Sequence, residues 1–140
     1  MTGTARSDER TLHIVAAVIV RDDGRFLLVR KHGTTAFMQV GGKIEPDEAP
    51  MEALVRECSE EIGLDVVDHA AVRPLGRYAA LAANEPGHMV DAHVFAVDLP
   101  SRFEPRAQAE LEELVWVDPT DPVTTHPIAP LSLDLLAAAR

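Results

Sequence analysis

Arg56, Glu57, Glu60 and Glu61 lie within six consecutive positions, and three of these four side chains are carboxylates. On a helix the three glutamates fall within about 100° of one another. Like charges at these spacings repel by roughly a few tenths of a kcal/mol per pair. Magnesium is a hard cation that binds carboxylate, water and phosphate oxygens, so it would turn that repulsion into coordination. The stretch therefore predicts a divalent-metal site that can act on a phosphate chain.

The element that must carry these carboxylates is a helix, which we expect over residues 47–62. Asp47 is the expected N-cap, Pro50 is tolerated in a first turn, and Gly63 is a natural C-terminal stop. A separate arc of the helix is apolar and gives it a core-facing stripe. That arc consists of Met51, Leu54, Val55, Cys58 and Ile62. Gly41 and Gly42 are expected to form a tight turn that brings the backbone close to the same metal or phosphate.

The residues around the glutamates carry a resemblance to a known family. Residues 42–64 resemble the Nudix box, G-x5-E-x7-R-E-U-x-E-E-x-G-U with U an apolar residue, and match every fixed position. Those positions are Gly42, Glu48, Arg56, Glu57, Glu60, Glu61 and Gly63, with Cys58 and Leu64 at apolar sites. A chance match to seven fixed letters is on the order of 10⁻⁹ per starting point. The resemblance implies an α/β fold, a Nudix-type α/β/α sandwich with a mixed central sheet.

The same resemblance implies a reaction and its metal ligands. Nudix enzymes hydrolyse a nucleoside diphosphate linked to another group, by attack of water on phosphorus. Glu57 and Glu61 match the principal metal-binding glutamates of the box, and Glu60 matches the third. The carbonyl group of Gly41 matches a common backbone ligand. The implied cofactor is Mg²⁺, with Mn²⁺ as the alternative.

Two further roles follow from the resemblance. Arg56 and Glu48 match a pair that orients the helix and its carboxylates. Glu57 is the first candidate for the base that accepts a proton from the attacking water. Several family members use a glutamate outside the box instead, and the candidates for that role here are Glu110, Glu104 and Glu85.

The substrate is less well specified than the reaction. Three subgroup markers of the family, for NADH, ADP-ribose and coenzyme A hydrolases, are absent. Canonical or oxidised nucleoside triphosphates, dinucleoside polyphosphates, nucleotide sugars and smaller diphosphates therefore remain open. Phe37 and Tyr78 could stack on a base, and Gln39 could hydrogen-bond to a base or sugar. Lys43 belongs to a cationic set that would offset the charge of a phosphorylated substrate, together with Arg30, Lys31 and Arg77.

Composition and length are typical of one enzyme domain. The chain has 140 residues, so we expect a loose tail over residues 1–10 and a single domain over residues 11–140. A formal net charge of −10 argues against partners such as nucleic-acid polymers or anionic membranes. A single cysteine and no membrane span or signal peptide favour a cytoplasmic protein. Whether the chain forms a homodimer is left open.

The remaining elements follow from apolar patterning and turn residues. Asp22, Asp23 and Gly24 predict a turn, so residues 12–20 and 25–31 read as a hairpin. Further strands are expected over residues 37–40, 66–81, 88–99 and 114–117, a surface connection over 118–130, and a closing helix over 131–139.

Two alternative functions fit parts of the pattern. The first is a Nudix domain that binds or senses a nucleotide without turnover, although such a module has no need for all four charged box residues. The second is an isomerase of the isopentenyl diphosphate type, which shares the fold. Cys58 argues against the isomerase, because it lies on the apolar arc of the helix rather than on the carboxylate face.

Overall fold

The computed structural model describes residues 10–66, 71–121 and 126–139. Its elements are β1 (Thr11–Val18), β2 (Phe26–Lys31), β3 (Val40–Lys43), α2 (Pro50–Ile62), β4 (Val72–Leu81), β5 (Met89–Val97), β6 (Leu111–Val117) and α3 (Pro130–Ala139). The predicted tail over residues 1–10 lies outside the described residues except for Arg10, so the domain boundary stays a prediction. Within the described residues, neither helix is long and apolar enough to cross a membrane.

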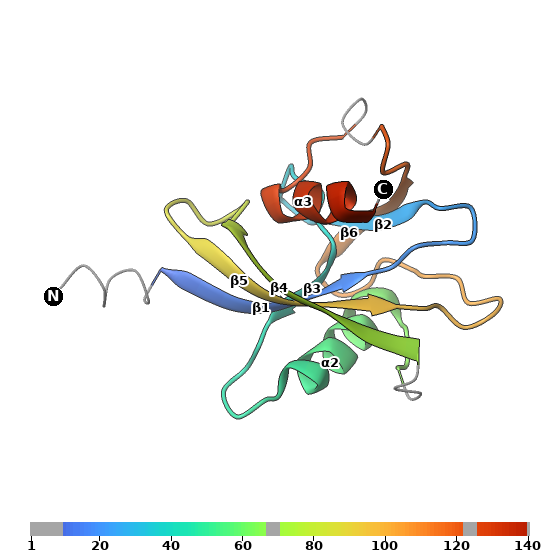
Figure 1. The fold of residues 1–140 in the computed structure, drawn as a ribbon, viewed down its shortest axis with the longest axis horizontal. Coiled ribbons are helices and arrows are strands. Elements are labelled where there is room, and N and C mark those ends of the chain that lie inside the picture. Colours follow the sequence, from blue (N-terminus) through green and yellow to red (C-terminus); the bar gives the residue numbers. More distant parts are fainter. Residues whose placement is uncertain (1–9, 67–70, 122–125, 140) are drawn as a thin grey trace, which may run out of the picture.

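The strands form a mixed four-stranded sheet and a second, two-stranded sheet. The first sheet has the order β3-β1-β5-β4, with β1 and β5 parallel and the other pairs antiparallel. The second sheet pairs β2 with β6 in antiparallel fashion. Helix α2 lies on one side of the larger sheet and α3 on the other (Figure 1). The α/β/α sandwich with a mixed sheet is thereby confirmed.

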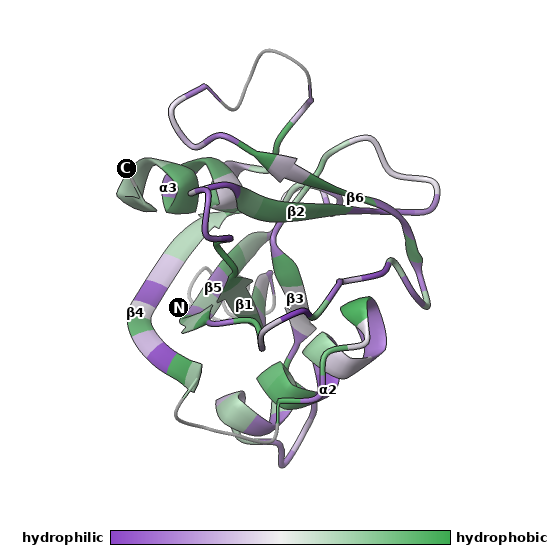
Figure 2. Cartoon of the chain, turned by 90° about the vertical axis from the view of Figure 1, so that its right-hand side faces the viewer, coloured by the Kyte–Doolittle hydropathy of each residue, from purple (hydrophilic) through white to green (hydrophobic). Residues whose placement is uncertain are grey.

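Alternating side chains of β1 supply the two hydrophobic cores, because successive residues of a strand face opposite sides of the sheet. Val15 and Ala17 belong to the cluster that includes Leu54 and Cys58 of α2. Ala16 and Val18 belong to the cluster that includes three leucines of α3, namely Leu131, Leu135 and Leu136. Strand β2 contributes to both cores and is coloured as largely hydrophobic in Figure 2, whereas the edge strand β4 alternates hydrophilic and hydrophobic residues.

The predicted hairpin between residues 12–20 and 25–31 is wrong. The turn itself exists, with the amide of Gly24 donating to the carbonyl of Arg21 over 2.8 Å. Only a single bridge, between Val20 and Phe26, joins the two segments. Apart from this bridge, β1 pairs with β3 and β5, whereas β2 pairs with β6 in the second sheet. Long-range pairing of the apolar strands therefore overrides the local turn signal.

Helix α2 begins later than predicted and ends where predicted. Asp47 is not its N-cap, because Asp47 adopts a left-handed conformation (φ 64°) in the preceding turn. The cap is Ala49, whose amide donates to the Glu52 side chain over 2.8 Å, and Pro50 occupies the first helical position, where its missing N–H costs nothing. Gly63 ends the helix in the left-handed conformation, with φ 71°.

The other predicted elements have shifted bounds. The strand expected over residues 37–40 is reduced to isolated bridges at Phe37 and Met38, and β3 starts only at Val40. Strand β4 starts at Val72, and residues 67–70 of the predicted strand 66–81 lie outside the described residues. Strands β5 and β6 and helix α3 lie close to their predicted places. Residues 122–125 of the predicted connection are likewise outside the described residues.

Candidate active site

Gly41 and Gly42 lie inside β3 and pair with β1, so the predicted glycine turn is wrong. Close packing explains these two glycines. A Cβ atom at Gly41 would lie 2.1 Å from the backbone oxygen of Val15, and one at Gly42 would lie 1.9 Å from a carboxylate oxygen of Glu57. Contacts this short exclude a side chain unless something moves. The absence of side chains thus allows the Glu57 carboxylate to approach the backbone of β3.

Two of the three glutamates expected to bind metal lie against this strand. The Gly41 amide donates a hydrogen bond to Oε1 of Glu61 over 3.1 Å. Glu61 is only 7% exposed, and the Glu57 side chain only 12%. The Glu60 side chain is 55% exposed and extends toward solvent. The helix therefore presents three carboxylates along one face, with two pressed against the glycine backbone and one at the surface.

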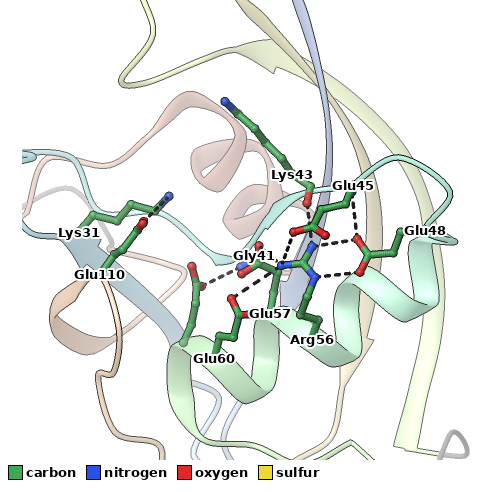
Figure 3. Close-up of polar contacts among 10 residues, drawn as sticks. Lys31, Gly41, Lys43, Glu45, Glu48, Arg56, Glu57, Glu60 and Glu110 are labelled. Carbon is green, nitrogen blue, oxygen red and sulfur yellow. Dashed lines mark hydrogen bonds and ion pairs between the residues drawn. The ribbon is translucent and has the colours of Figure 1, made fainter.

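Arg56 connects these carboxylates to the loop before the helix (Figure 3). Its Nε and Nη2 atoms donate to the two oxygens of Glu48 over 2.8 and 2.9 Å, and Nη2 also donates to the carbonyl of Lys43 over 3.0 Å. Its Nη1 atom lies 3.3 Å from Glu57 and 3.7 Å from Glu60. The predicted Arg56–Glu48 pair is thus formed. Hydrogen bonding to Arg56 lowers the pKa of Glu48 to about 2.

Burial raises the pKa of two carboxyl groups at this site. The pKa of Glu61 rises to about 8, first through burial and then through the charge of Glu57, against the opposing effect of the Gly41 hydrogen bond. The pKa of Glu57 is also raised, chiefly by burial and further by the charge of Glu60, while Arg56 opposes the rise. Both shifts therefore disfavour the charged carboxylates at this site, chiefly because the groups are taken out of water. An added cation would favour the charged forms.

The donor set fits a hard divalent cation in its chemistry. Carboxylate and backbone carbonyl oxygens are the ligands that Mg²⁺ prefers, and Glu57, Glu60 and Glu61 supply the carboxylates beside Gly41. Among residues 10–66, 71–121 and 126–139, no three acidic, histidine or cysteine side chains are already grouped closely enough to hold an ion. In this arrangement Glu57 and Glu60 contact Arg56, and Glu61 accepts a hydrogen bond from the Gly41 amide.

A cavity of about 220 Å³ adjoins the glycines of β3. Its polar lining includes Gln39, Lys31 and Lys43 beside Gly41 and Gly42. The remaining lining is mostly apolar and comes from β1, from the start of β5 and from the segment between β4 and β5, with Leu12, Ile14, Ala82 and Val90 among its members. The cavity therefore adjoins the same two glycines that the carboxylates of Glu57 and Glu61 approach.

The structure does not bring the two predicted aromatic contacts to this cavity. Phe37 is 5% exposed, lies in the core under α3, and has the ring of His126 at 4.8 Å. Tyr78 lines a separate cavity of about 330 Å³ between β4 and α3. Neither ring borders the space beside Gly41. Their predicted role in binding substrate stays a prediction that this geometry does not support.

The alternative bases differ in where they lie. Glu110 has a largely exposed side chain whose carboxylate is 3.8 Å from Nζ of Lys31, and its charge reaches Glu61. Glu85 lines the cavity and lies 3.3 Å from Nζ of Lys43. Glu104 lines a different cavity, near Trp116. Glu110 and Glu85 are therefore close to the site, and Glu104 is not.

Of the four predicted cationic residues, two line the cavity and two do not. Lys31 and Lys43 line the cavity. Arg30 instead forms a two-pronged contact with Glu113, with nitrogen–oxygen distances of 2.7 and 2.9 Å, and Arg77 pairs with Asp91. Only the two lysines are placed to meet a phosphorylated substrate.

One polar residue of this region was not anticipated from the sequence. Ser132 of α3 is fully buried and hydrogen-bonds to Gln39, which lies 93 positions away in the chain. The signal was a single serine among leucines in the helix expected over residues 131–139. Without knowledge of the fold, that serine has no visible partner.

Comparisons with known proteins place this geometry in context. The model of the NUDIX domain matches residues 11–138. The CTP pyrophosphohydrolase of Escherichia coli is 34% identical over 134 residues, which covers 92% of this chain and 91% of that protein.

Solved structures with the same fold include a MutT NUDIX hydrolase from Burkholderia pseudomallei, with a TM-score of 0.73 and 26% identity over 91% of this chain and 96% of that one. The solution structure of the Escherichia coli ORF135 protein has a TM-score of 0.66 and 30% identity, covering 92% of this chain and 88% of that one.

Proposed function

The chain belongs to the NUDIX domain family and is a pyrophosphohydrolase of that family, and we propose that it uses Mg²⁺ to hydrolyse a nucleoside diphosphate linked to a further group. The observation that carries this proposal is the meeting of Glu57 and Glu61 with the glycine backbone of β3, next to a cavity lined by two lysines. The similarity to a CTP pyrophosphohydrolase supports nucleoside triphosphates as the substrate class.

The metal ligands that we propose are the carboxylates of Glu57, Glu60 and Glu61 and the carbonyl of Gly41. Their oxygen donors and the raised pKa values of the Glu57 and Glu61 carboxyl groups, which are largely withdrawn from water, support this assignment. When bound, the divalent cation would neutralise phosphate oxygens and lower the pKa of an attacking water. Mn²⁺ has the same ligand preferences and is the natural substitute in assays.

Glu57 is the residue that we propose as the proton acceptor. Its side chain is largely enclosed beside β3, and burial raises the pKa of its carboxyl group, which makes the carboxylate a stronger base. Glu110 is the second candidate, because its exposed side chain can approach the site with Lys31. Glu85 is the third, because it lines the cavity and lies 3.3 Å from Nζ of Lys43.

Arg56 acts in this proposal as a positioning residue. Two hydrogen bonds to Glu48 and one to the Lys43 carbonyl fix its guanidinium group, which then contacts both Glu57 and Glu60. Such a two-pronged contact defines orientation as well as distance. Arg56 would therefore limit how far the two carboxylates can move when substrate enters.

Gln39 and Lys43 are the residues that we propose to contact the substrate, and Lys31 joins them. The two ammonium groups can approach the phosphate chain from the cavity side, opposite the carboxylate helix. They would offset part of the formal charge of −10 that otherwise repels a polyphosphate.

The test is product analysis on a nucleotide panel with Mg²⁺ and with excess chelator. The panel contains the four ribonucleoside triphosphates, their deoxy forms, a dinucleoside polyphosphate and a nucleotide sugar. The proposal expects metal-dependent release of a nucleoside monophosphate together with pyrophosphate or a second phosphorylated group. Equal rates with and without chelator, or no cleavage of any diphosphate, would refute it. The cytoplasmic location stays a prediction.

A further inference from the structure

A buried polar pair joins the cavity to helix α3. Among the described residues only three polar or charged side chains are buried, namely Gln39, Glu61 and Ser132, at 6%, 7% and 0% exposure. Gln39 and Ser132 bond to each other twice. The backbone N–H of Gln39 donates to Oγ of Ser132 over 2.9 Å. The Ser132 hydroxyl in turn donates to Oε1 of the Gln39 side chain over 2.6 Å.

The backbone around this pair is held in place. The amide of Phe37 donates to the carbonyl of Pro127, and the amide of Ala129 donates to the carbonyl of Phe37, both over 2.8 Å. These bonds tie the segment before β3 to the start of α3. Backbone hydrogen bonds therefore join the two segments that carry Gln39 and Ser132.

The donors and acceptors of Ser132 determine the orientation of the Gln39 side-chain amide group. A serine hydroxyl has one hydrogen to donate and two lone pairs that accept. One lone pair of Ser132 is taken by the Gln39 backbone amide. If the side-chain amide were turned over, its NH₂ group would occupy the second lone pair, and the hydroxyl hydrogen would lose the acceptor that it now has. A fully buried donor without a partner is costly, so the arrangement with Oε1 toward Ser132 is favoured.

The Nε2 group of Gln39 is consequently left to face the cavity. Within the described part of the chain, Nε2 has no hydrogen-bond partner, whereas every fully buried side-chain nitrogen and oxygen there has one. Nε2 must therefore be accessible, and Gln39 lines the cavity beside Gly41. That cavity thus has a largely apolar wall, the charged ends of Lys31, Lys43 and Glu85, and at Gln39 an NH₂ donor whose orientation a buried hydrogen bond sets.

These features define what the cavity can recognise. A space of about 220 Å³ is smaller than the roughly 300–1,000 Å³ of a whole-ligand pocket, so it suits one group of a nucleotide. Apolar walls favour the faces of a flat ring. Because Oε1 of Gln39 is directed toward Ser132, its amide presents the NH₂ group to the cavity, so the ring must present a hydrogen-bond acceptor to it.

Resting on the proposed function, we propose that Ser132 locks the Gln39 amide so that this cavity selects nucleobases through an acceptor atom, a carbonyl oxygen or a ring nitrogen without hydrogen. Ser132 is a positioning residue in this account and touches no substrate. Gln39 is the residue that determines specificity.

The experiment compares kcat/KM for CTP and UTP in the wild type and in two variants. Cytosine and uracil have the same size but place donors and acceptors differently on their edges. Gln39→Glu keeps the shape and the bond from Ser132 but replaces the NH₂ donor with an acceptor. Ser132→Ala removes the lock and frees the amide to turn over. The ratio of the two kcat/KM values does not depend on how much protein is folded, so a loss of stability alone cannot change it.

We expect Gln39→Glu to lower kcat/KM for the preferred nucleotide by roughly tenfold or more, through KM, because a donor is replaced by a charged acceptor. We expect Ser132→Ala to reduce the preference between CTP and UTP by roughly two- to tenfold, with little change in kcat. A preference unchanged in both variants would overturn this inference and leave the proposed function standing. If the wild type hydrolyses no nucleotide, the proposed function fails and this inference fails with it.

Discussion

Replacing Gly42 with alanine would displace the Glu57 carboxylate without requiring the fold to move. The new Cβ atom would lie 1.9 Å from Oε2 and 2.6 Å from Cδ of Glu57, both atoms at the end of a flexible side chain. Ordinary contact begins at 3.4 Å, so Oε2 must move by about 1.5 Å. Misplacement of a catalytic group by about 1 Å can cost on the order of 100-fold in rate. We therefore expect kcat of Gly42→Ala to fall by about 100-fold.

The Gly42→Ala variant should lose activity without losing stability. Gly42 lies in β3 and is not among the residues with positive φ, so alanine is compatible with its backbone. Alanine restricts the unfolded chain and contributes about 0.4–1 kcal/mol at compatible positions. We expect the melting temperature of Gly42→Ala to stay the same or to rise slightly.

Gly41→Ala is the matched control. Its Cβ atom would meet the backbone oxygen of Val15 at 2.1 Å, and backbone cannot rotate away as a side chain can. This variant should lose stability, unlike Gly42→Ala.

A second control tests whether Glu57 transmits the effect. If Gly42→Ala acts through Glu57, adding it to Glu57→Gln should cost little further activity, because groups that act as a unit are not additive. The assays are steady-state hydrolysis of the best nucleotide with Mg²⁺ and thermal unfolding. Full activity in Gly42→Ala, or a loss that adds in full to that of Glu57→Gln, would refute the reasoning.

Two other predictions concern stability and reactivity. The pKa of Glu48 is lowered from 4.5 to about 2 by Arg56, so its ion pair stabilises the fold above pH 4.5 and that stabilisation is lost as the pH falls through about 2. The difference in unfolding midpoint between wild type and Glu48→Gln should therefore shrink from pH 5 to pH 2, and a constant difference would contradict the assigned pair. Burial raises the pKa of the Cys58 thiol to about 12. At pH 8 a thiol reagent should label Cys58 only after denaturant is added, and rapid labelling of the folded protein would revive the isomerase alternative.

The box glutamates and the helix that carries them could be predicted because their pattern is local. Gly63 ends α2 as expected, since a left-handed residue after an apolar helical stripe needs no distant partner. Asp47 failed as a cap because Pro50, three residues later, is an equally local signal that defined the first turn. Asp47 and Pro50 are both helix-start signals, and local sequence alone does not decide which of them sets the first turn.

The strand pairing could not be predicted in the same way. The turn at Gly24 is real, but Phe26 and the residues after it pair with β6, which lies about 90 positions further along the chain, as in the partnership of Phe26 with Val117. Gly41 and Gly42 read as a turn because glycines are common there, whereas the structure uses them for close approach of Val15 and Glu57. Both outcomes depend on packing between distant segments.

The Gln39–Ser132 pair lies beyond sequence reasoning for the same reason. Gln39 was a candidate for reading a base, but nothing local showed that its oxygen is already used. Phe37 was one of the two candidates for stacking, and its ring lies in the core instead. Which side chains face a cavity is decided by the register of the segment on the finished fold.

The most direct test of the account is a titration of divalent metal into the folded protein without substrate. Binding of Mn²⁺, followed by electron paramagnetic resonance, is compared among wild type, Glu57→Gln, Glu61→Gln and Glu104→Gln. Because Glu104 lines another cavity, its variant is the control. The account predicts that the Kd for metal rises by at least roughly tenfold in the first two variants and stays unchanged in the third. Equal metal affinity in all four proteins would contradict it.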